Sequence, residues 1–214
     1  MNAVHKILAA ILITALAAGC SSNKKLLEQQ QMEITSLTTR LNEAEQQLAE
    51  EQARAANLTA ELDQVLAEFS EKEELYLEQI NSKTVITLPD AVLFSSGSAR
   101  LTSSGKGILD RIAGVLEEHP DREILVEGHT DDVQIANQYL SKYPSNWELS
   151  SARAHSVLHY FQDQHRFPGK RLSAIGYGEY RPLTGSDTPE GRAMNRRVVI
   201  SIGPMRQEER QTLP

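Results

Sequence analysis

The feature that most constrains this chain is a run from Lys25 to Asn81 that contains neither proline nor glycine. Apolar side chains recur along it at every seventh position, a spacing that keeps one face of a helix against a neighbouring helix. This first seam reads Leu27, Ile34, Leu41, Leu48, Ala55, Leu62, Phe69 and Tyr76. The second seam, three residues on, is apolar only in its middle and reads Gln30, Leu37, Ala44, Glu51, Leu58, Val65, Lys72 and Gln79. The pattern predicts an α-helical coiled coil over residues 25–82.

The heptads indicate a homo-oligomer, because a helix this long has no core of its own to pack against. The alternative is a solitary surface helix, and the spacing does not distinguish a dimer from a trimer. A helix of about 57 residues at about 1.5 Å per residue would extend roughly 85 Å. We therefore expect this rod to act as a spacer.

An apolar segment near the N-terminus ends at the only cysteine of the chain. Lys6 precedes a run from Ile7 to Ala18, and Gly19-Cys20 follows. A basic start, a short apolar core and small residues before a cut describe an export signal. The run has about 12 residues, whereas a membrane-spanning helix needs about 20. With one cysteine, a disulfide within the chain is excluded.

The same segment resembles a bacterial lipoprotein signal, in which cleavage before Cys20 leaves a thiol that receives lipid such as palmitate. Residues 1–19 are then the signal peptide and 20–24 the lipidated N-terminus. Ala17 stands where leucine is more usual. By the same resemblance, Ser21 in place of aspartate favours the outer membrane. An ordinary signal peptide with an incidental cysteine is the alternative.

Charge is unevenly distributed along the chain. Residues 24–82 carry 13 acids and 5 bases, whereas residues 83–214 carry 16 of each. The second half therefore has no basic excess, and phosphate backbones are bound by clustered lysine and arginine. We expect no nucleic-acid partner.

The second half has the pattern of a small α+β domain. Strands are predicted at 83–88, 123–128, 172–176 and 197–202, from short β-branched or alternating apolar runs. Helices are predicted from Ser103 or Ser104 to near Pro120, and from about Leu149 to Gln164. The order β-α-β-α-β-β predicts a two-layer sandwich over residues 83–203, with two helices on one face of a small mixed sheet. The polar tail, 204–214, is expected to be disordered.

Two segments of this domain suggest a binding site. Asp131 follows a predicted strand, in Gly128-His129-Thr130-Asp131, and Arg153 lies early in a predicted helix. An acid and an arginine in one pocket suit a zwitterion, because the carboxylate holds an ammonium and the guanidinium grips a carboxylate. Taken singly, Asp131 is explained by an Asx turn and Arg153 by a structural salt bridge.

These segments resemble the OmpA-like peptidoglycan-binding domain over roughly residues 84–203, and Pro144 to Ser150 is closest to its MotB-type branch. The resemblance implies an α/β sandwich, and implies that Asp131 and Arg153 bind diaminopimelate in the stem peptide of peptidoglycan. It extends the site to further positions on matching motifs, namely Phe94, Ser95, Gly97, Ser98, Thr130, Asn146, Leu149 and Arg197. The 94–98 loop is equally explained as a connector, and Arg197 as a structural partner of Glu127.

Three other observations bear on the site. The connector 133–145, with Tyr139, Lys142 and Tyr143, is an insertion typical of the MotB-type branch and is expected near the pocket. His155 and His159 have a spacing compatible with a metal, but no third ligand is evident and we expect none. A hydrolase built on Ser150 is disfavoured, because no Gly-Xaa-Ser-Xaa-Gly sequence occurs.

The expected protein is therefore a non-enzymatic, cofactor-free outer-membrane lipoprotein, periplasm-facing, that tethers the membrane to the wall by binding its stem peptide. The alternative is a signalling or flagellar-stator-like component, in which wall binding anchors a partner held by the coiled coil. A stator subunit needs a full transmembrane helix with a buried acid. The segment from Ile7 to Ala18 provides neither.

Overall fold

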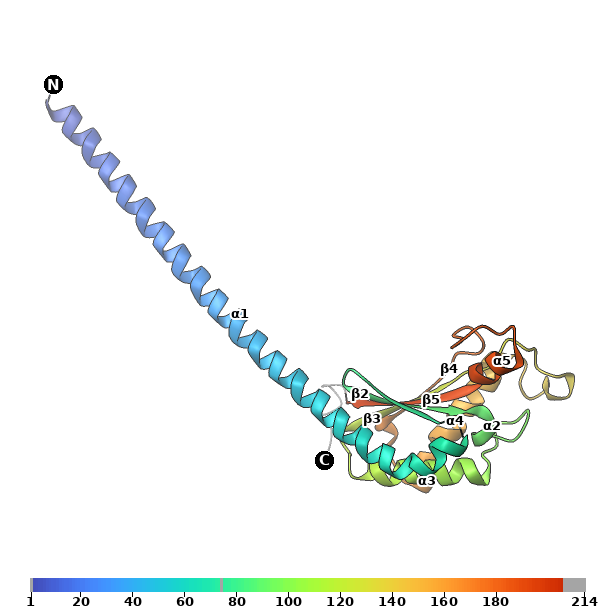
Figure 1. Ribbon diagram of the computed structural model, residues 1–214. Coiled ribbons are helices and arrows are strands. Elements are labelled where there is room, and N and C mark those ends of the chain that lie inside the picture. Colours follow the sequence, from blue (N-terminus) through green and yellow to red (C-terminus); the bar gives the residue numbers. More distant parts are fainter. Residues whose placement is uncertain (1, 74, 206–214) are drawn as a thin grey trace. The chain divides into compact units, whose positions relative to one another are not determined.

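The computed structural model describes residues 2–73 and 75–205, and it describes side chains from residue 23 onward except at 68 and 70–73. The chain divides into two compact units, residues 1–49 and 50–214 (Figure 1). Of the tail predicted to be disordered over 204–214, Pro204 is instead the last residue of a strand and Met205 is buried. The side chains of the predicted signal peptide and of Cys20, and residues 206–214, lie outside what is described.

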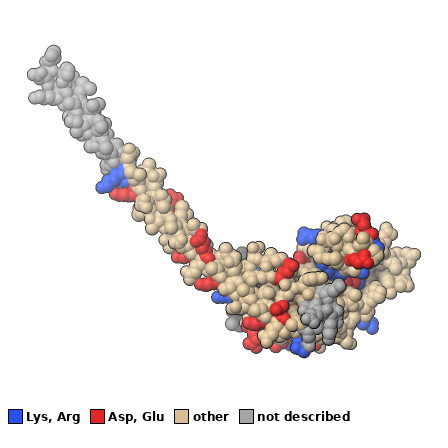
Figure 2. Space-filling view, in the orientation of Figure 1, with Lys and Arg blue, Asp and Glu red and all other residues tan. Residues whose placement is uncertain are grey.

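The first unit is the N-terminal part of helix α1 (Asn2–Glu73). Its predicted seam is open to solvent: the side chains at Leu27, Ile34, Leu41 and Leu48 are between 52 and 65% exposed. Figure 2 shows acidic side chains spaced along this unit, and no continuous stretch of Lys and Arg on the face in view. The apolar seam thus has no partner among the described residues of a single chain.

The second unit is built on a five-stranded sheet with the order β1-β2-β5-β3-β4. The strands are β1 (Tyr76–Ile80), β2 (Lys83–Pro89), β3 (Arg122–Gly128), β4 (Leu172–Gly176) and β5 (Arg197–Pro204). Strand β5 runs antiparallel to β2 and β3, and β3 runs parallel to β4. The predicted α+β class and its mixed sheet are confirmed.

Helices cover one face of this sheet. The helices of the second unit are α2 (Asp90–Leu93), α3 (Ser103–Glu117), α4 (Asn146–Gln164) and α5 (Pro189–Asn195), with 3-10 turns η1 (Asn137–Tyr139) and η2 (Gly169–Arg171). Thr102 caps α3 by accepting from the backbone N–H of Gly105, and Ser145 caps α4 through Trp147. These caps satisfy N–H groups that the first turn of a helix leaves free.

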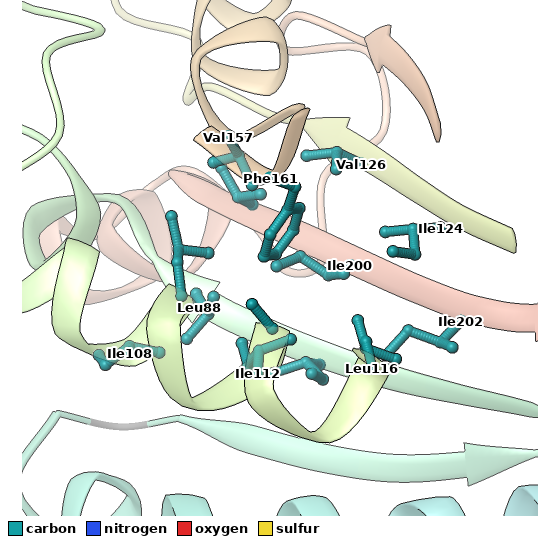
Figure 3. Packing of buried hydrophobic residues seen from close by; sticks show 14 of the residues in the cluster. Leu88, Ile108, Ile112, Leu116, Ile124, Val126, Val157, Phe161, Ile200 and Ile202 are labelled. Carbon is teal, nitrogen blue, oxygen red and sulfur yellow. The ribbon is translucent and has the colours of Figure 1, made fainter. Parts of the chain in front are cut away.

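The core lies between the sheet and its helices, as Figure 3 shows. Alternate residues of the strands point to one face, so that Ile86, Ile124, Val126, Ile200 and Ile202 meet the apolar sides of α3 and α4. All five are at most 1% exposed. The helices are therefore held mainly by apolar burial, at about 25 cal/mol per Å² of surface removed from water.

The predicted rod does not run to residue 82. Residues 76–80 form β1, which pairs antiparallel with β2 through a two-residue turn at Asn81-Ser82. Asn81 has φ +56°, a conformation that asparagine tolerates better than most residues and that two-residue hairpins require. The prediction was wrong here because Leu, Glu and Gln favour helices and Tyr76 continues the seven-residue spacing.

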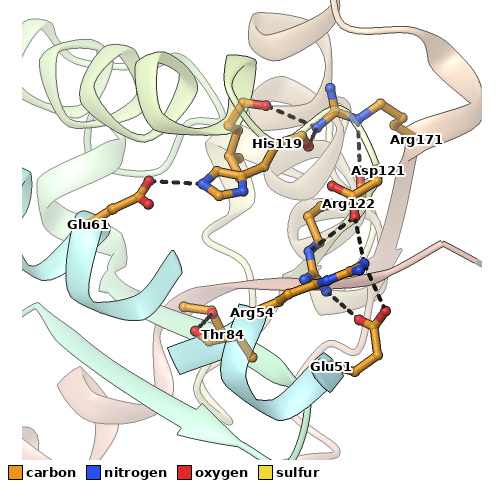
Figure 4. A network of polar contacts seen from close by, with 10 residues as sticks. Glu51, Arg54, Glu61, Thr84, His119, Asp121, Arg122 and Arg171 are labelled. Atoms are coloured by element: carbon orange, nitrogen blue, oxygen red, sulfur yellow. Dashed lines mark hydrogen bonds and ion pairs between the residues drawn. The ribbon is translucent and has the colours of Figure 1, made fainter. Parts of the chain in front are cut away.

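The C-terminal part of α1 is also not a free rod, because it belongs to the domain core. Leu58, Leu62 and Leu66 are at most 1% exposed and pack in the same cluster as α3. Polar contacts border this packing, as Figure 4 shows: Glu51 Oε2 lies 3.0 Å from Arg122 Nη1, and Glu61 Oε2 lies 2.9 Å from His119 Nε2. The compact domain thus begins near Glu50, whereas the sequence predicted a start at residue 83.

Candidate functional site

The site begins where β3 meets the first turns of α4. A Cβ on Gly128 would collide with the carbonyl of Ser150, so only glycine lets the strand end approach the helix this closely. The chain then continues through Thr130 and Asp131 beside the N-terminus of α4. Asn146 Nδ2 holds this segment by donating to the carbonyl oxygens of Asp131 and Val133, at 3.3 and 3.1 Å.

A pocket of about 680 Å³ opens beside this junction. It lies between the start of α4, the 130–136 loop, the 94–97 loop and the end of α5. The predicted site residues that line it are Phe94, Gly97, Thr130, Asp131, Asn146, Leu149 and Arg153. Asp90, Tyr139, Tyr143, Arg192 and Arg196 line it too and were not among the predicted contacts.

Asp131 is buried and makes two kinds of contact. Its Oδ1 accepts from the backbone N–H of Val133 at 3.2 Å, which is the Asx turn expected for an aspartate after a strand. Its Oδ2 lies 2.6 Å from Nη1 of Arg196. The Asx turn therefore accounts for one carboxylate oxygen of Asp131, and the ion pair with Arg196 accounts for the other.

Arg153 projects from α4 into the pocket wall and is 4% exposed. Its Nη2 lies 2.9 Å from Oδ2 of Asp90, and its Nε donates to the carbonyl of Ser98 at 3.1 Å. Its guanidinium stands over the ring of Phe94, 5.5 Å from the centroid. Arg153 thus fixes the 94–98 loop, and it is salt-bridged to Asp90 and not to Asp131.

Two ion pairs therefore meet at the pocket, Asp90 with Arg153 and Asp131 with Arg196, and Arg192 is a third arginine on its wall. Burial raises the pKa of Asp90, and the charges of Arg153 and Arg196 act against that rise. Burial lowers the pKa of Arg153, and Asp90 and Asp131 act against that change. Charges this buried are maintained by pairing, so each member depends on the others.

Arg197, which the sequence suggested as a contact, does not line this pocket. Its guanidinium donates to the carbonyls of Asn195 and Arg181, at 3.2 and 3.1 Å. The neighbouring Arg196 takes the place beside Asp131. Successive side chains of an extended backbone point to opposite sides, and Arg197 begins β5. The pocket is therefore lined by Arg196, the residue before the one that the sequence suggested.

The 94–98 loop is shaped by the insertion that follows Asp131. Gly97 has φ +63°, and a Cβ there would overlap the ring of Tyr139. The backbone N–H of Ala99 donates to the Tyr143 hydroxyl at 3.3 Å. Ser95 and Ser98 do not line the pocket, although the Ser98 carbonyl bonds Arg153. The expected position of the insertion near the pocket is therefore observed at Tyr139 and Tyr143.

The competing chemistries receive no support from the geometry. The rings of His155 and His159 lie 6.4 Å apart, and no group of three or more metal-ligating side chains forms among the described residues. The Ser150 hydroxyl is fully buried, where it donates to the Trp147 carbonyl and accepts from the Gly178 N–H. That hydroxyl therefore links α4 to the 177–180 turn.

Fold and site together define a small α+β binding domain with a charge-paired pocket. The OmpA family matches residues 93–196. The cell wall anchor of the T6SS from Pseudomonas aeruginosa, a solved structure, is 34% identical with a TM-score of 0.61, and the match covers 67% of this chain and 96% of that one. The chain belongs to the OmpA family.

Two curated relatives from Bacillus subtilis (strain 168) show how much of a longer protein the likeness covers. Motility protein B is 31% identical over 156 residues, 73% of this chain and 59% of that protein. The uncharacterized protein YtxE is 42% identical over 118 residues, 55% of this chain and 47% of that protein. The chain spans about half the length of these relatives. In the described residues, no helix has a stretch long and apolar enough to cross a membrane.

Proposed function

We propose that this protein is an outer-membrane lipoprotein, facing the periplasm, whose domain binds the diaminopimelate-containing stem peptide of peptidoglycan and so tethers the membrane to the wall. The observation that carries the proposal is the set of four paired charges around one pocket. The solved relative described as a cell wall anchor, with 34% identity over most of its length, supports it.

The free end of diaminopimelate carries an ammonium beside a carboxylate. Asp131, at the pocket wall, can accept the ammonium in place of Arg196, which then turns to the incoming carboxylate. Arg153 offers the second guanidinium edge for the same carboxylate. A zwitterion thus exchanges partners with the two ion pairs, so that its ammonium and its carboxylate each meet an opposite charge.

Two buried side-chain oxygens beside these charges have unsatisfied hydrogen-bonding capacity. Asp90 Oδ1 and Thr130 Oγ1 make no hydrogen bond to any described residue. Both residues line the pocket. An unsatisfied buried polar group costs about 1–3 kcal/mol. Binding of a ligand with N–H donors, such as an ammonium and peptide amides, would recover that free energy once the side chains that line the pocket adjust to it.

The test is co-sedimentation of the full chain, in detergent, with purified sacculi. Asp131→Asn and Arg153→Ala should each reduce pelleting at least tenfold, since a charge-assisted hydrogen bond contributes about 1.5–3 kcal/mol. Asp132→Ala is the matched control, because this neighbouring acid is exposed and does not line the pocket. Free diaminopimelate should compete with sacculi for the wild type. Equal pelleting of all variants would remove the site assignment, once circular dichroism shows that each is folded.

The lipid anchor is a separate part of the proposal and rests on Lys6, the apolar run and Gly19-Cys20. Cys20→Ala should leave an unprocessed precursor, or release the protein from the membrane fraction into the soluble one. Fractionation with an antibody to the domain measures this directly. A variant that is still processed and still sediments with membranes would contradict lipidation at Cys20.

A second function remains open because the apolar seam of the first unit is exposed. Leu27, Ile34, Leu41 and Leu48 can pair with another helix, either of a second copy or of a different protein. With a second copy, the protein is an oligomeric tether. With a different protein, wall binding anchors a signalling or stator-like complex, and the likeness to motility protein B is the observation that suggests this alternative. Crosslinking through residues 24–49 in cells separates the two.

A further inference from the structure

Next to the charged pocket, two aromatic rings lie stacked on the surface. The rings of Trp147 and Tyr180 are 5.0 Å apart between centroids and inclined by 21°. Trp147 is 46% exposed and Tyr180 is 63% exposed. Large aromatic side chains held open to water form an apolar surface that is characteristic of a binding site.

The loop that carries Tyr180 is held by other contacts besides this stack. Backbone groups already fix that loop to the domain: Tyr177 N–H donates to the Gly128 carbonyl, and Thr130 N–H donates to the Gly178 carbonyl, both at 2.9 Å. Gly178 N–H also donates to the Ser150 hydroxyl at 2.9 Å. Backbone bonds therefore anchor the loop, and the stacked rings lie beside it open to solvent.

The rings border a hollow of about 290 Å³ whose remaining wall is rich in amides. The side-chain amides of Gln134 and Asn137 line it and make no hydrogen bond to other described residues. Glu179 lines it as well and accepts from Asn146 Nδ2 at 2.6 Å. A flat apolar face beside free amide donors and acceptors suits a pyranose, which has a C–H face and a rim of hydroxyl and acetamido groups.

The hollow adjoins the charged pocket. Gln134, Ile135 and Asn146 line both. In peptidoglycan the stem peptide is covalently attached to an amino sugar of the glycan strand, and three extended residues reach about 10 Å. When a stem peptide binds in the charged pocket, the sugar to which it is attached can therefore reach this neighbouring hollow.

We propose that the hollow formed by Trp147, Tyr180 and the amides of Gln134 and Asn137 is a sugar subsite, which takes the amino sugar that bears the stem peptide. This inference rests on the proposed function, since it assigns the rest of the same ligand. Two linked contacts bind more tightly than either alone, because the second is made at a high effective concentration.

The chain offers a direct reporter, because Trp147 is its single tryptophan. The full chain in detergent is titrated with three ligands: a free diaminopimelate-containing stem tripeptide, peptide-free glycan strands, and a disaccharide–peptide fragment. The two ligands with sugar should shift or quench Trp147 emission, and the free peptide should leave it nearly unchanged. Calorimetry should show the disaccharide–peptide binding about tenfold more tightly than the free peptide.

Variants isolate the contribution of the rings. Tyr180→Ala should remove the tenfold advantage of the disaccharide–peptide while leaving the affinity for the free peptide unchanged, and Tyr180→Phe should retain it. Tyr76→Ala is the matched control, because Tyr76 is 55% exposed on β1 and does not line the hollow. These readouts separate a sugar contact from a structural role, which would affect all three ligands alike.

The outcomes also separate this inference from the proposed function. Tight binding of free peptide, with no response of Trp147 to either sugar ligand and no loss in Tyr180→Ala, overturns the sugar subsite alone. A response to glycan strands without any binding of free peptide supports the subsite and overturns the stem-peptide site. No binding of any ligand overturns both.

Discussion

At the scale of single residues, two adjacent arginines have different roles. Arg196 faces the pocket and pairs with Asp131, whereas Arg197 turns away and bonds backbone carbonyls. The boundary between α5 and β5 falls between them. A sequence motif locates such a pair, but only the strand register decides which member faces a ligand.

Arg196→Ala should therefore weaken sacculus binding at least tenfold, because the ligand carboxylate then loses one of its two proposed guanidinium partners. Co-sedimentation of the full chain measures the loss. Arg100→Ala is the matched control, since this arginine is exposed and absent from the pocket wall. Undiminished binding by Arg196→Ala would show that Arg196 does not take part in the site.

His129 gives the domain a pH-dependent stability. Burial, together with the charges of Arg197 and Arg181, lowers the pKa of His129 from 6.5 to about 4. The unfolded chain therefore binds a proton as the pH falls through 6.5, while the folded chain binds it only near 4. The free energy of unfolding should fall by about 3 kcal/mol between these values.

Urea unfolding at a series of pH values measures this slope. His129→Gln should flatten the part of the profile between pH 6.5 and 4, because the titrating group is gone. If the variant keeps the wild-type slope in that window, other groups are responsible for it. The pocket variants are best compared at pH 7, where the His129 contribution is constant.

The sequence located the two charges of the site but not their partners. Asp131 and Arg153 were expected to share one pocket, and both line it. Asp90 was missed because an aspartate after Pro89 looks like an ordinary turn residue, and its partner Arg153 is distant in sequence. Local patterns predict which residues are charged and near a strand end; they do not predict which pairs meet through tertiary contacts.

At the scale of elements, one heptad pattern has two physical causes. Leu58 and Leu62 lie on the two predicted seams and are buried in the domain core, whereas Leu27, Ile34 and Leu41 lie on the first seam and are exposed. Both sets fit the heptad pattern, because a helix on a sheet and a helix in a coiled coil each bury one stripe. This ambiguity is why the division of α1 and the strand β1 were not predicted. The helices α3 and α4 and the other four strands were predicted well.

Two leucine variants distinguish these causes. Leu62→Ala should destabilise the domain by about 2–5 kcal/mol, because it leaves a cavity in the core. Leu41→Ala should leave the unfolding of the domain unchanged and should weaken self-association instead. Chemical unfolding followed by circular dichroism and sedimentation velocity on the full chain give the two readouts. A core-like loss of stability in Leu41→Ala would contradict this assignment.

At the scale of the whole molecule, the residues that stabilise the domain are distinct from the surfaces that are available to partners. The second unit has its own sheet, core and pocket. The first unit offers an exposed apolar stripe and, by proposal, a lipid. Fold class followed from the order of the predicted elements, whereas the compartment depends on the segment 1–22, whose side chains are not described.

The burial of the last turns of α1 has a mechanical consequence for a tether. Within the second unit, a pull on residues 50–66 would act as shear across a face where Leu58, Leu62 and Leu66 must leave the core together with the Glu51–Arg122 pair. Interactions that must break at once resist force better than those that break one by one, so this packing suits the tethering role proposed above.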